Sequence, residues 1–242
     1  MRDMRFDAVF FDSGGTLYGR GGDGDPTPAQ VEAGRVRRVE AALNGFDVEV
    51  AYDLLERRLR VCEEECKERL GAAYNFYRLM TVLCEDLELD LGPEEAACLA
   101  DAYAGPRYAS WLFPGTLDVI RRFSERGIYL GVIANTVWPG FCMDRAFAGV
   151  GLLPYFKTRV YSGDLGVAKP DARIFHLAEA ISGLKGKRIL FVGNNLKADI
   201  QGASGVGWAT AFRKNGGRSG EGLADFEFEE TTELPGIVLG DD

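Results

Sequence analysis

The chain has 242 residues, of which 46% are hydrophobic, 11% aromatic and 27% charged, and its formal net charge at pH 7 is −9. This composition predicts a globular protein with one large domain or a core with an insertion, and the negative charge argues against nucleic-acid binding, because nucleic-acid binders present a basic face. No apolar run reaches the roughly 18 residues of a transmembrane helix, and the first residues lack the pattern of a secretory signal, so we expect a cytoplasmic protein without a membrane partner.

The amino-terminal part of the chain predicts one strand, a linker and a helical segment. Residues 9–17 read Val-Phe-Phe-Asp-Ser-Gly-Gly-Thr-Leu, in which apolar residues run into Asp12 and then into a loop of small residues. Glycines and prolines between residues 18 and 28 predict the linker. Beyond it, apolar residues recur at helical spacing, which predicts four helices near 29–43, 48–70, 75–89 and 93–104.

From Trp111 onward, helical and strand-like patterns alternate. The predicted elements are a helix 115–123, a strand 128–134, a helix 140–150, a strand 159–161, a helix 171–182, a strand 188–192, a helix 198–204 and a strand 208–212. This alternation predicts a doubly wound parallel sheet with helices on both faces. We therefore expect an α/β core formed by residues 1–18 and 108–242, and a four-helix cap formed by residues 19–107.

Four short segments fall at the carboxyl ends of predicted strands, where open α/β sheets carry their functional groups. They are Asp12-Ser-Gly-Gly-Thr16-Leu17, Val132-Ile-Ala134-Asn135-Thr136, Gly166-Val-Ala-Lys169-Pro170-Asp171 and Val192-Gly-Asn194-Asn195-Leu-Lys-Ala-Asp199. Their order and spacing, with a helical insertion after the first, resemble the haloacid dehalogenase (HAD) superfamily of hydrolases over nearly the whole chain. The resemblance implies the Rossmann-like HAD fold, a cap domain and a small-molecule substrate.

The resemblance also implies roles for individual residues. Asp12 would be the nucleophile and form a covalent aspartyl intermediate, which water then hydrolyses. Lys169 would neutralise the charge of Asp12 and of the transferring group. Thr16, Asn135, Lys169 and Gly14 would bind the phosphate of the substrate.

A magnesium site is implied at the same strand ends. Its ligands would be Asp12, the main-chain carbonyl of Gly14, Asn194 and Asp199, because magnesium prefers oxygen ligands. Asn194 stands where the family has its first acid of the last segment, and the loss of one negative charge weakens the implied site.

Three positions depart from the family pattern. Gly14 stands where the family has an acid, Ala134 where it has Ser or Thr, and Asn194 where it has the first acid of the last segment. The acid at the first position normally protonates the leaving group and then activates water, a role worth on the order of 10² to 10⁴ in rate. We therefore expect impaired or unusual chemistry.

Three functions stay open on the sequence. The simplest is a magnesium-assisted phosphatase that acts on a small phosphorylated metabolite through an aspartyl-phosphate at Asp12. The alternative is a catalytically silent homologue that binds a metabolite or a protein partner. The third is a metal-independent dehalogenase, whose halide leaving group needs no proton.

Charged residues of the predicted cap bear on these alternatives. Arg35, Arg37 and Arg38 could supply the cation that binds the carboxylate of a haloacid, although a solvated helix face is the simpler interpretation. Lys67 lies four residues after Glu63, which predicts a solvated ion pair on a helix rather than a lysine that forms a Schiff base with substrate.

Overall fold

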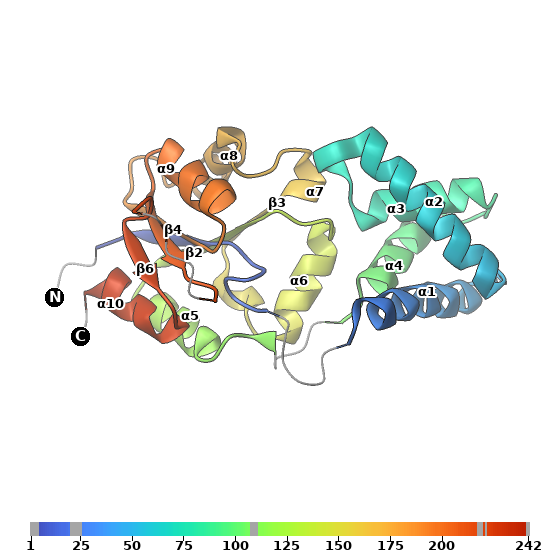
Figure 1. Cartoon of the computed structure of the whole chain (residues 1–242), viewed down its shortest axis with the longest axis horizontal. Coiled ribbons are helices and arrows are strands. Elements are labelled where there is room, and N and C mark those ends of the chain that lie inside the picture. Colours follow the sequence, from blue (N-terminus) through green and yellow to red (C-terminus); the bar gives the residue numbers. More distant parts are fainter. Residues whose placement is uncertain (1–4, 20–25, 107–110, 217–219, 221, 241–242) are drawn as a thin grey trace.

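The computed structural model describes residues 5–19, 26–106, 111–216, 220 and 222–240. Within them, one parallel sheet of six strands forms the centre of the molecule, in the order β3-β2-β1-β4-β5-β6 (Figure 1). The strands are β1 (Ala8–Phe11), β2 (Tyr129–Ala134), β3 (Thr158–Tyr161), β4 (Ile189–Gly193), β5 (Ala209–Arg213) and β6 (Phe226–Phe228). Because β1 pairs with β2 on one side and β4 on the other, its carboxyl end lies in the middle of the sheet edge.

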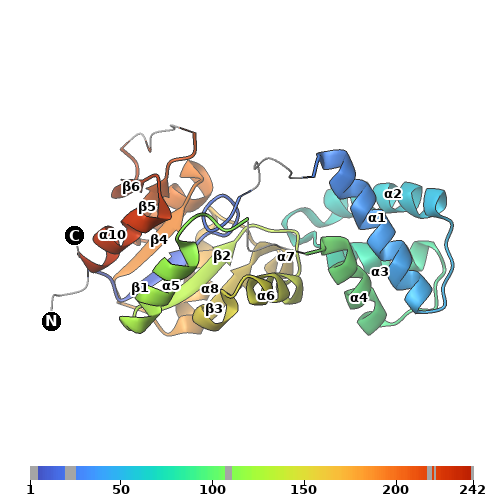
Figure 2. The same ribbon diagram turned by 90° about the horizontal axis from the view of Figure 1, so that it is seen from below.

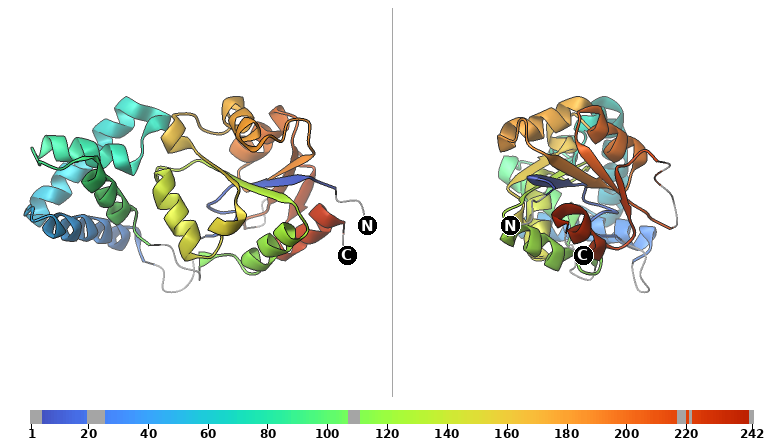
Figure 3. Two further views of the ribbon diagram at one scale, coloured as in Figure 1. Left: turned by 180° about the vertical axis from the view of Figure 1, so that it is seen from behind. Right: turned by 90° about the vertical axis from the view of Figure 1, so that its left-hand side faces the viewer.

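The sheet is covered on both faces. Val9 and Phe11 of β1 pack in one hydrophobic cluster and Ala8 and Phe10 in another, as the alternation of side chains along a strand requires. The first face is covered by α5 (Thr116–Glu125), α6 (Gly140–Gly149) and α10 (Leu234–Leu239), and the second by α8 (Ala172–Ser182) and α9 (Gly202–Gly205). Figure 3 shows α5 and α10 on the opposite side of the sheet from α8 and α9. The predicted doubly wound sheet is therefore confirmed.

A helical insertion stands at one end of the core (Figures 1 and 2). In the described part of this insertion the helices are α1 (Pro28–Gly45), α2 (Tyr52–Leu70), α3 (Phe76–Asp86) and α4 (Pro93–Ala104). Thr27 begins α1 by accepting a hydrogen bond from the amide of Gln30, and Pro28 occupies the first turn. Helices α1 and α3 each pack against α2 and α4. The insertion thus has a core of its own.

The four helices predicted for the insertion are confirmed, with shifts of a few residues at their ends. Three short elements were not expected: β6, α10 and α7 (Ser162–Leu165). They are too short to show a period, so tertiary contacts decide them. The predicted domain boundary at 107/108 lies outside the described residues and the one at 18/19 borders such a stretch, so both stay predictions. None of the helices in the described ranges is long and apolar enough to cross a membrane.

Candidate active site

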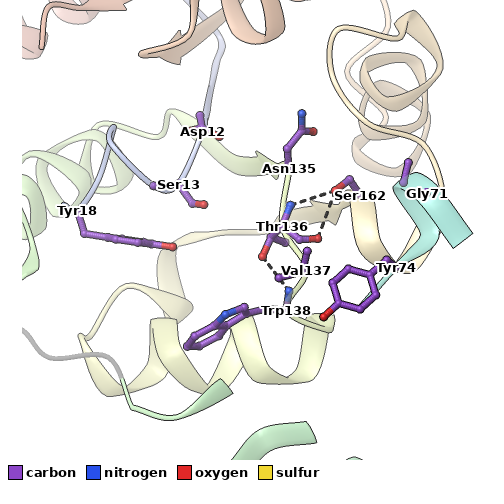
Figure 4. A pocket seen from close by; sticks show the side chains of 12 residues that line it. Asp12, Ser13, Tyr18, Gly71, Tyr74, Asn135, Thr136, Val137, Trp138 and Ser162 are labelled. Carbon is purple, nitrogen blue, oxygen red and sulfur yellow. Dashed lines mark hydrogen bonds between the residues drawn. The ribbon is translucent and has the colours of Figure 1, made fainter. Parts of the chain in front are cut away.

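A cavity of about 530 Å³ lies between the carboxyl edge of the sheet and the helical insertion. Its walls come from the loops after β1 and β2, from the start of α7 and from the segment between α2 and α3. The lining residues are Asp12, Ser13, Gly14, Tyr18, Gly71, Ala72, Tyr74, Asn135, Thr136, Val137, Trp138 and Ser162. In Figure 4 the aromatic side chains of Tyr18, Tyr74 and Trp138 lie around this space, with Asp12 above them.

Asp12 directly follows β1 and reaches the cavity as part of a buried charge trio with Lys169 and Asp199. The Lys169 ammonium lies 2.8 Å from Oδ1 of Asp12 and 2.7 Å from Oδ1 of Asp199. The side chains of Lys169 and Asp199 are 1% and 2% exposed, whereas that of Asp12 is 13% exposed. Asp12 is therefore the member of the trio that a substrate in the cavity can reach.

Burial raises the pKa of the Asp12 carboxyl above its ordinary value of 3.8. The positive charge of Lys169 opposes this shift, and the negative charge of Asp199 adds to it. A carboxyl in a site with two acids and one ammonium is expected to hold its proton more tightly than one in water, because ionisation leaves a net negative charge away from solvent.

Asn135 lines the cavity, and both ends of its side-chain amide are bonded to the main chain of Lys169. Its Nδ2 donates to the main-chain carbonyl of Lys169 at 2.9 Å, and its Oδ1 accepts from the main-chain amide of Lys169 at 2.9 Å. These two bonds tie the loop after β2 to the residue that carries the ammonium. The Asn135 side chain thus positions Lys169, and its predicted phosphate-binding role stays a prediction.

Thr16 and Asn194 meet on the other side of Asp12. The Thr16 hydroxyl lies 3.4 Å from Oδ2 of Asp12 and 3.2 Å from Oδ1 of Asn194. Since a hydroxyl carries one hydrogen, it satisfies only one of these two oxygens at a time. Gly15, between the two segments, has φ +82°, and a Cβ on it would lie 2.4 Å from Nδ2 of Asn194. The close approach requires glycine at this position.

Both oxygens of the buried Asp199 carboxylate have donors within the protein. Its Oδ2 accepts from the amides of Asn194 and Asn195 at 3.0 and 2.9 Å, and its Oδ1 pairs with Lys169. The expected ligand set of Asp12, the Gly14 carbonyl, Asn194 and Asp199 stays a prediction, and without Asp199 it would consist of Asp12, Asn194 and the Gly14 carbonyl. In the described ranges there is also no group of three or more His, Cys, Asp or Glu residues that could hold a metal. The remaining oxygens fit magnesium by chemistry but carry a single negative charge.

Comparison with known proteins identifies the family of the chain. A family model described as haloacid dehalogenase-like hydrolase matches residues 6–207 of the chain. The chain belongs to the haloacid dehalogenase-like hydrolases.

Relatives of this hydrolase carry different activities. It is 26% identical to a glyceraldehyde 3-phosphate phosphatase of Methanopyrus kandleri over 241 residues, which cover 96% of each chain. It is 31% identical to an (S)-2-haloacid dehalogenase of Pseudomonas sp. (strain YL) over 155 residues, which cover 64% of each chain. A solved HAD-hydrolase from Bacillus subtilis, bound to magnesium, shares the fold with a TM-score of 0.54 and 17% identity, covering 96% of this chain and 98% of that one.

Cationic side chains of the cap lie away from the reacting groups of the hydrolase. The Arg35 guanidinium stacks 5.2 Å from the Phe76 ring and 5.0 Å from the Tyr103 ring. Arg38 donates to the main-chain carbonyls of Ala102 and Tyr103 at 2.6 and 3.2 Å. Arg35 and Arg38 are thus half-buried against the cap, whereas Arg37 is exposed, as a solvated helix face predicts. None of the described residues that line the cavity is Lys, Arg or His.

The ion pair predicted for Lys67 is confirmed. Its ammonium lies 2.8 Å from Oε1 of Glu63, which also accepts a hydrogen bond of 2.9 Å from the Tyr74 hydroxyl. These bonds, together with the charge of Lys67, lower the pKa of the Glu63 carboxyl, although burial opposes the shift. Lys67 is thus engaged on the cap surface and does not line the cavity.

Some residues that line the cavity were not predicted from the sequence. Ser162 accepts from the amide of Thr136 at 3.0 Å and joins the loops after β2 and β3. It follows a predicted strand directly, and that position was the signal that could have found it. Gly71 and Ala72 belong to the cap, and nothing in the local pattern indicates that this turn faces the sheet edge.

Replacing Lys169 by methionine is expected to destabilise the hydrolase by about 3–5 kcal/mol, because two buried carboxylates lose the cation that they share. Urea unfolding at neutral pH measures the change, and Lys185→Met, at an exposed position, is the control. A decrease in the free energy of unfolding of less than about 1 kcal/mol would contradict a buried charge trio, because ion pairs on a protein surface contribute no more than that.

Proposed function

We propose that the protein is a phosphatase that acts on a small phosphorylated metabolite through an aspartyl-phosphate at Asp12. One observation carries the proposal: the Asp12 carboxylate reaches the cavity while its Oδ1 is held 2.8 Å from a buried ammonium. This contact fixes the carboxylate in place without blocking its second oxygen.

The proposed reaction has two displacements. A carboxylate oxygen of Asp12 attacks phosphorus, an O–P bond forms, and the P–O bond to the leaving group breaks. Water then attacks the aspartyl-phosphate, which releases inorganic phosphate and restores the carboxylate. Lys169 stays charged through both steps and offsets the negative charge that gathers at Asp12.

Magnesium would be held by Asp12, the Gly14 carbonyl and Asn194, and when bound it would neutralise charge on the transferring phosphoryl group. The proposal gives Asp199 a different task from the one implied by the family resemblance. It holds Lys169 and the turn at Asn194 and Asn195. We expect the metal to be bound weakly, since one carboxylate is left to hold it.

The cavity favours a phosphatase over a dehalogenase. A 2-haloacid brings a carboxylate that needs a cation of its own, and the described lining residues supply none. Arg35 and Arg38, the candidates for that task, are engaged inside the cap. The relative with phosphatase activity also covers nearly the whole chain, whereas the dehalogenase relative covers less than two thirds.

The leaving group is expected to limit the range of substrates. Asp12 is the only acid among the described residues that line the cavity, so no carboxyl is placed to protonate a departing alkoxide. Substrates whose leaving group is already a weak base, such as acyl phosphates, avoid this need. We therefore propose faster turnover of acyl and aryl phosphates than of alkyl phosphates.

A substrate panel tests the proposal. The purified protein is assayed with acetyl phosphate, p-nitrophenyl phosphate, glycerol 3-phosphate and 2-chloropropionate, each with magnesium and with EDTA. Turnover of the first two, stimulated by magnesium, is expected. Release of chloride without metal would favour the dehalogenase instead, and binding of phosphate esters without any turnover would favour the silent homologue.

The pH dependence of turnover follows from the raised pKa of Asp12. Only the ionised carboxylate attacks, so kcat/KM, which reports the free enzyme, is expected to fall as the pH drops through that pKa, with a midpoint above the ordinary 3.8. Turnover of p-nitrophenyl phosphate from about pH 4 to about pH 8 measures the profile, with circular dichroism as the control for folding. A rate that stays constant down to about pH 4 would contradict the raised pKa.

A further inference from the structure

Arg213, the last residue of β5, is a buried cation outside the cavity and outside the charge trio. It is 6% exposed. Its Nη1 donates to the main-chain carbonyl of Gly15 at 3.1 Å, and its Cζ lies 3.3 Å from the centroid of the Phe113 ring. Within the described residues its Nε has no hydrogen-bond partner, and no ion pair is formed. Its Nη1 also lies 3.5 Å from Oδ1 of Asn215, so two oxygen acceptors and a ring face hold the guanidinium.

The contacts to Gly15 and Phe113 belong to the two segments by which the chain passes between core and cap. Gly15 lies on the first segment, in the loop after Asp12, and Phe113 on the second. Main-chain hydrogen bonds join the segments directly: the Phe113 amide donates to the Leu17 carbonyl at 3.1 Å, and the Gly19 amide donates to the Trp111 carbonyl at 3.0 Å. Arg213 thus bridges two segments that already lie side by side.

Packing around this bridge is tight. A Cβ on Gly19 would lie 2.7 Å from the Phe113 ring, and a Cβ on Gly15 would lie 2.4 Å from Asn194. The Gly15 carbonyl accepts a second hydrogen bond, of 3.3 Å, from Nδ2 of Asn215. The peptide after Gly15 is therefore fixed from both sides, and with it the Thr16 hydroxyl that lies beside Asp12 and Asn194.

A buried arginine without an acid partner needs other compensation for its lost hydration. The hydrogen bond to the Gly15 carbonyl and the stacking on the Phe113 ring compensate for the lost hydration here. Both depend on the planar shape of the guanidinium. A lysine at this position would keep the charge and one donor but could not stack on Phe113 while donating to Gly15 in the same way. The contacts are thus specific to arginine.

We propose that Arg213 is a positioning residue that holds the loop after Asp12, residues 13–17, against the segment that carries Phe113. Its effect on rate rests on the proposed phosphatase activity, whereas its effect on the loop does not. The arrangement keeps the Thr16 hydroxyl beside the Asp12 carboxylate, and Arg213 itself does not contact the substrate.

Amide hydrogen exchange of the full-length protein without substrate tests the positioning directly. In Arg213→Met, which keeps length and removes the donors, exchange at Leu17, Gly19 and Phe113 is expected to be about tenfold faster or more, with the sheet and α2 unchanged. Arg121→Met, on the exposed face of α5, is the matched control. Protection equal to the wild type at these three amides, or a uniform loss across β1, β4 and β5, would overturn the proposal.

Kinetics give the second readout. Arg213→Met is expected to lower kcat for acetyl phosphate by about tenfold or more while KM changes by less than about threefold, because the loop misplaces Thr16 and Asp12 but not the cap walls. Arg213→Lys is expected to recover only part of the loss. A change in KM with kcat unchanged would overturn the positioning role. A wild-type protein that turns over no substrate would refute the proposed function and leave the exchange experiment to decide on Arg213.

Discussion

Replacing Asp12 by asparagine is expected to abolish turnover, with a loss in kcat of about 10⁴-fold or more. An amide is a poor nucleophile and cannot form an acyl phosphate that water hydrolyses. The variant should fold, because Lys169 keeps its pair with Asp199 at 2.7 Å and the trio loses one of its two negative charges. Loss of activity in Asp12→Asn would therefore report chemistry and not unfolding.

The measurement is kcat for acetyl phosphate and p-nitrophenyl phosphate, together with mass spectrometry of the quenched enzyme for a phosphoryl adduct. Asp118→Asn, at a side chain that is 81% exposed, is the matched control. An adduct in the wild type and its absence in Asp12→Asn are expected. Equal turnover in the two proteins would rule out the aspartyl-phosphate, whatever residue then carried the reaction.

Introducing an acid at position 14 is expected to increase turnover of alkyl phosphates by about 10² to 10⁴-fold, the usual value of general acid catalysis. Gly14 has room for a side chain: the nearest atom to an added Cβ is Cε2 of Tyr18 at 3.9 Å, an ordinary contact, and its φ is not in the left-handed region. Gly14→Asp would place a carboxyl on the cavity wall, one residue beyond Ser13.

A comparison of two substrates shows whether the carboxyl introduced at position 14 acts as a general acid. Glycerol 3-phosphate has a poor leaving group and should benefit, whereas acetyl phosphate should change by less than about threefold because its leaving group needs no proton. Gly14→Asn has nearly the same shape without the acid and serves as the control. A gain in Gly14→Asn equal to that in Gly14→Asp, or no gain for glycerol 3-phosphate, would refute the explanation of the missing acid.

The fold could be predicted from the sequence because its signals are local. The apolar run 8–11, the helical spacing of Val36, Val39 and Leu43, and the later alternation each depend on a few neighbouring residues. Strand ends of a parallel sheet share one edge, so Asp12 and Lys169 could also be expected to meet. Their separation of 2.8 Å agrees with that expectation.

The details of the site could not be predicted because they depend on which loops touch. No local pattern indicated that the side-chain amide of Asn135 bonds to the main chain of Lys169. Nor did any indicate that Asp199 accepts from the amides of Asn194 and Asn195 and pairs with Lys169. Arg213 gave no signal, since a lone arginine at the end of a strand looks like any surface cation until Gly15 and Phe113 are placed beside it.

The double hydrogen bond between Asn135 and Lys169 has a consequence for related sequences. These two residues, with Asp199, connect the ends of three strand–loop segments, so they would be retained for architecture even in a relative that no longer turns over substrate. Their presence is therefore poor evidence for activity in such a relative. Gain and loss of catalysis across relatives should instead be sought at cavity-lining positions that form no such structural bonds, above all at Gly14.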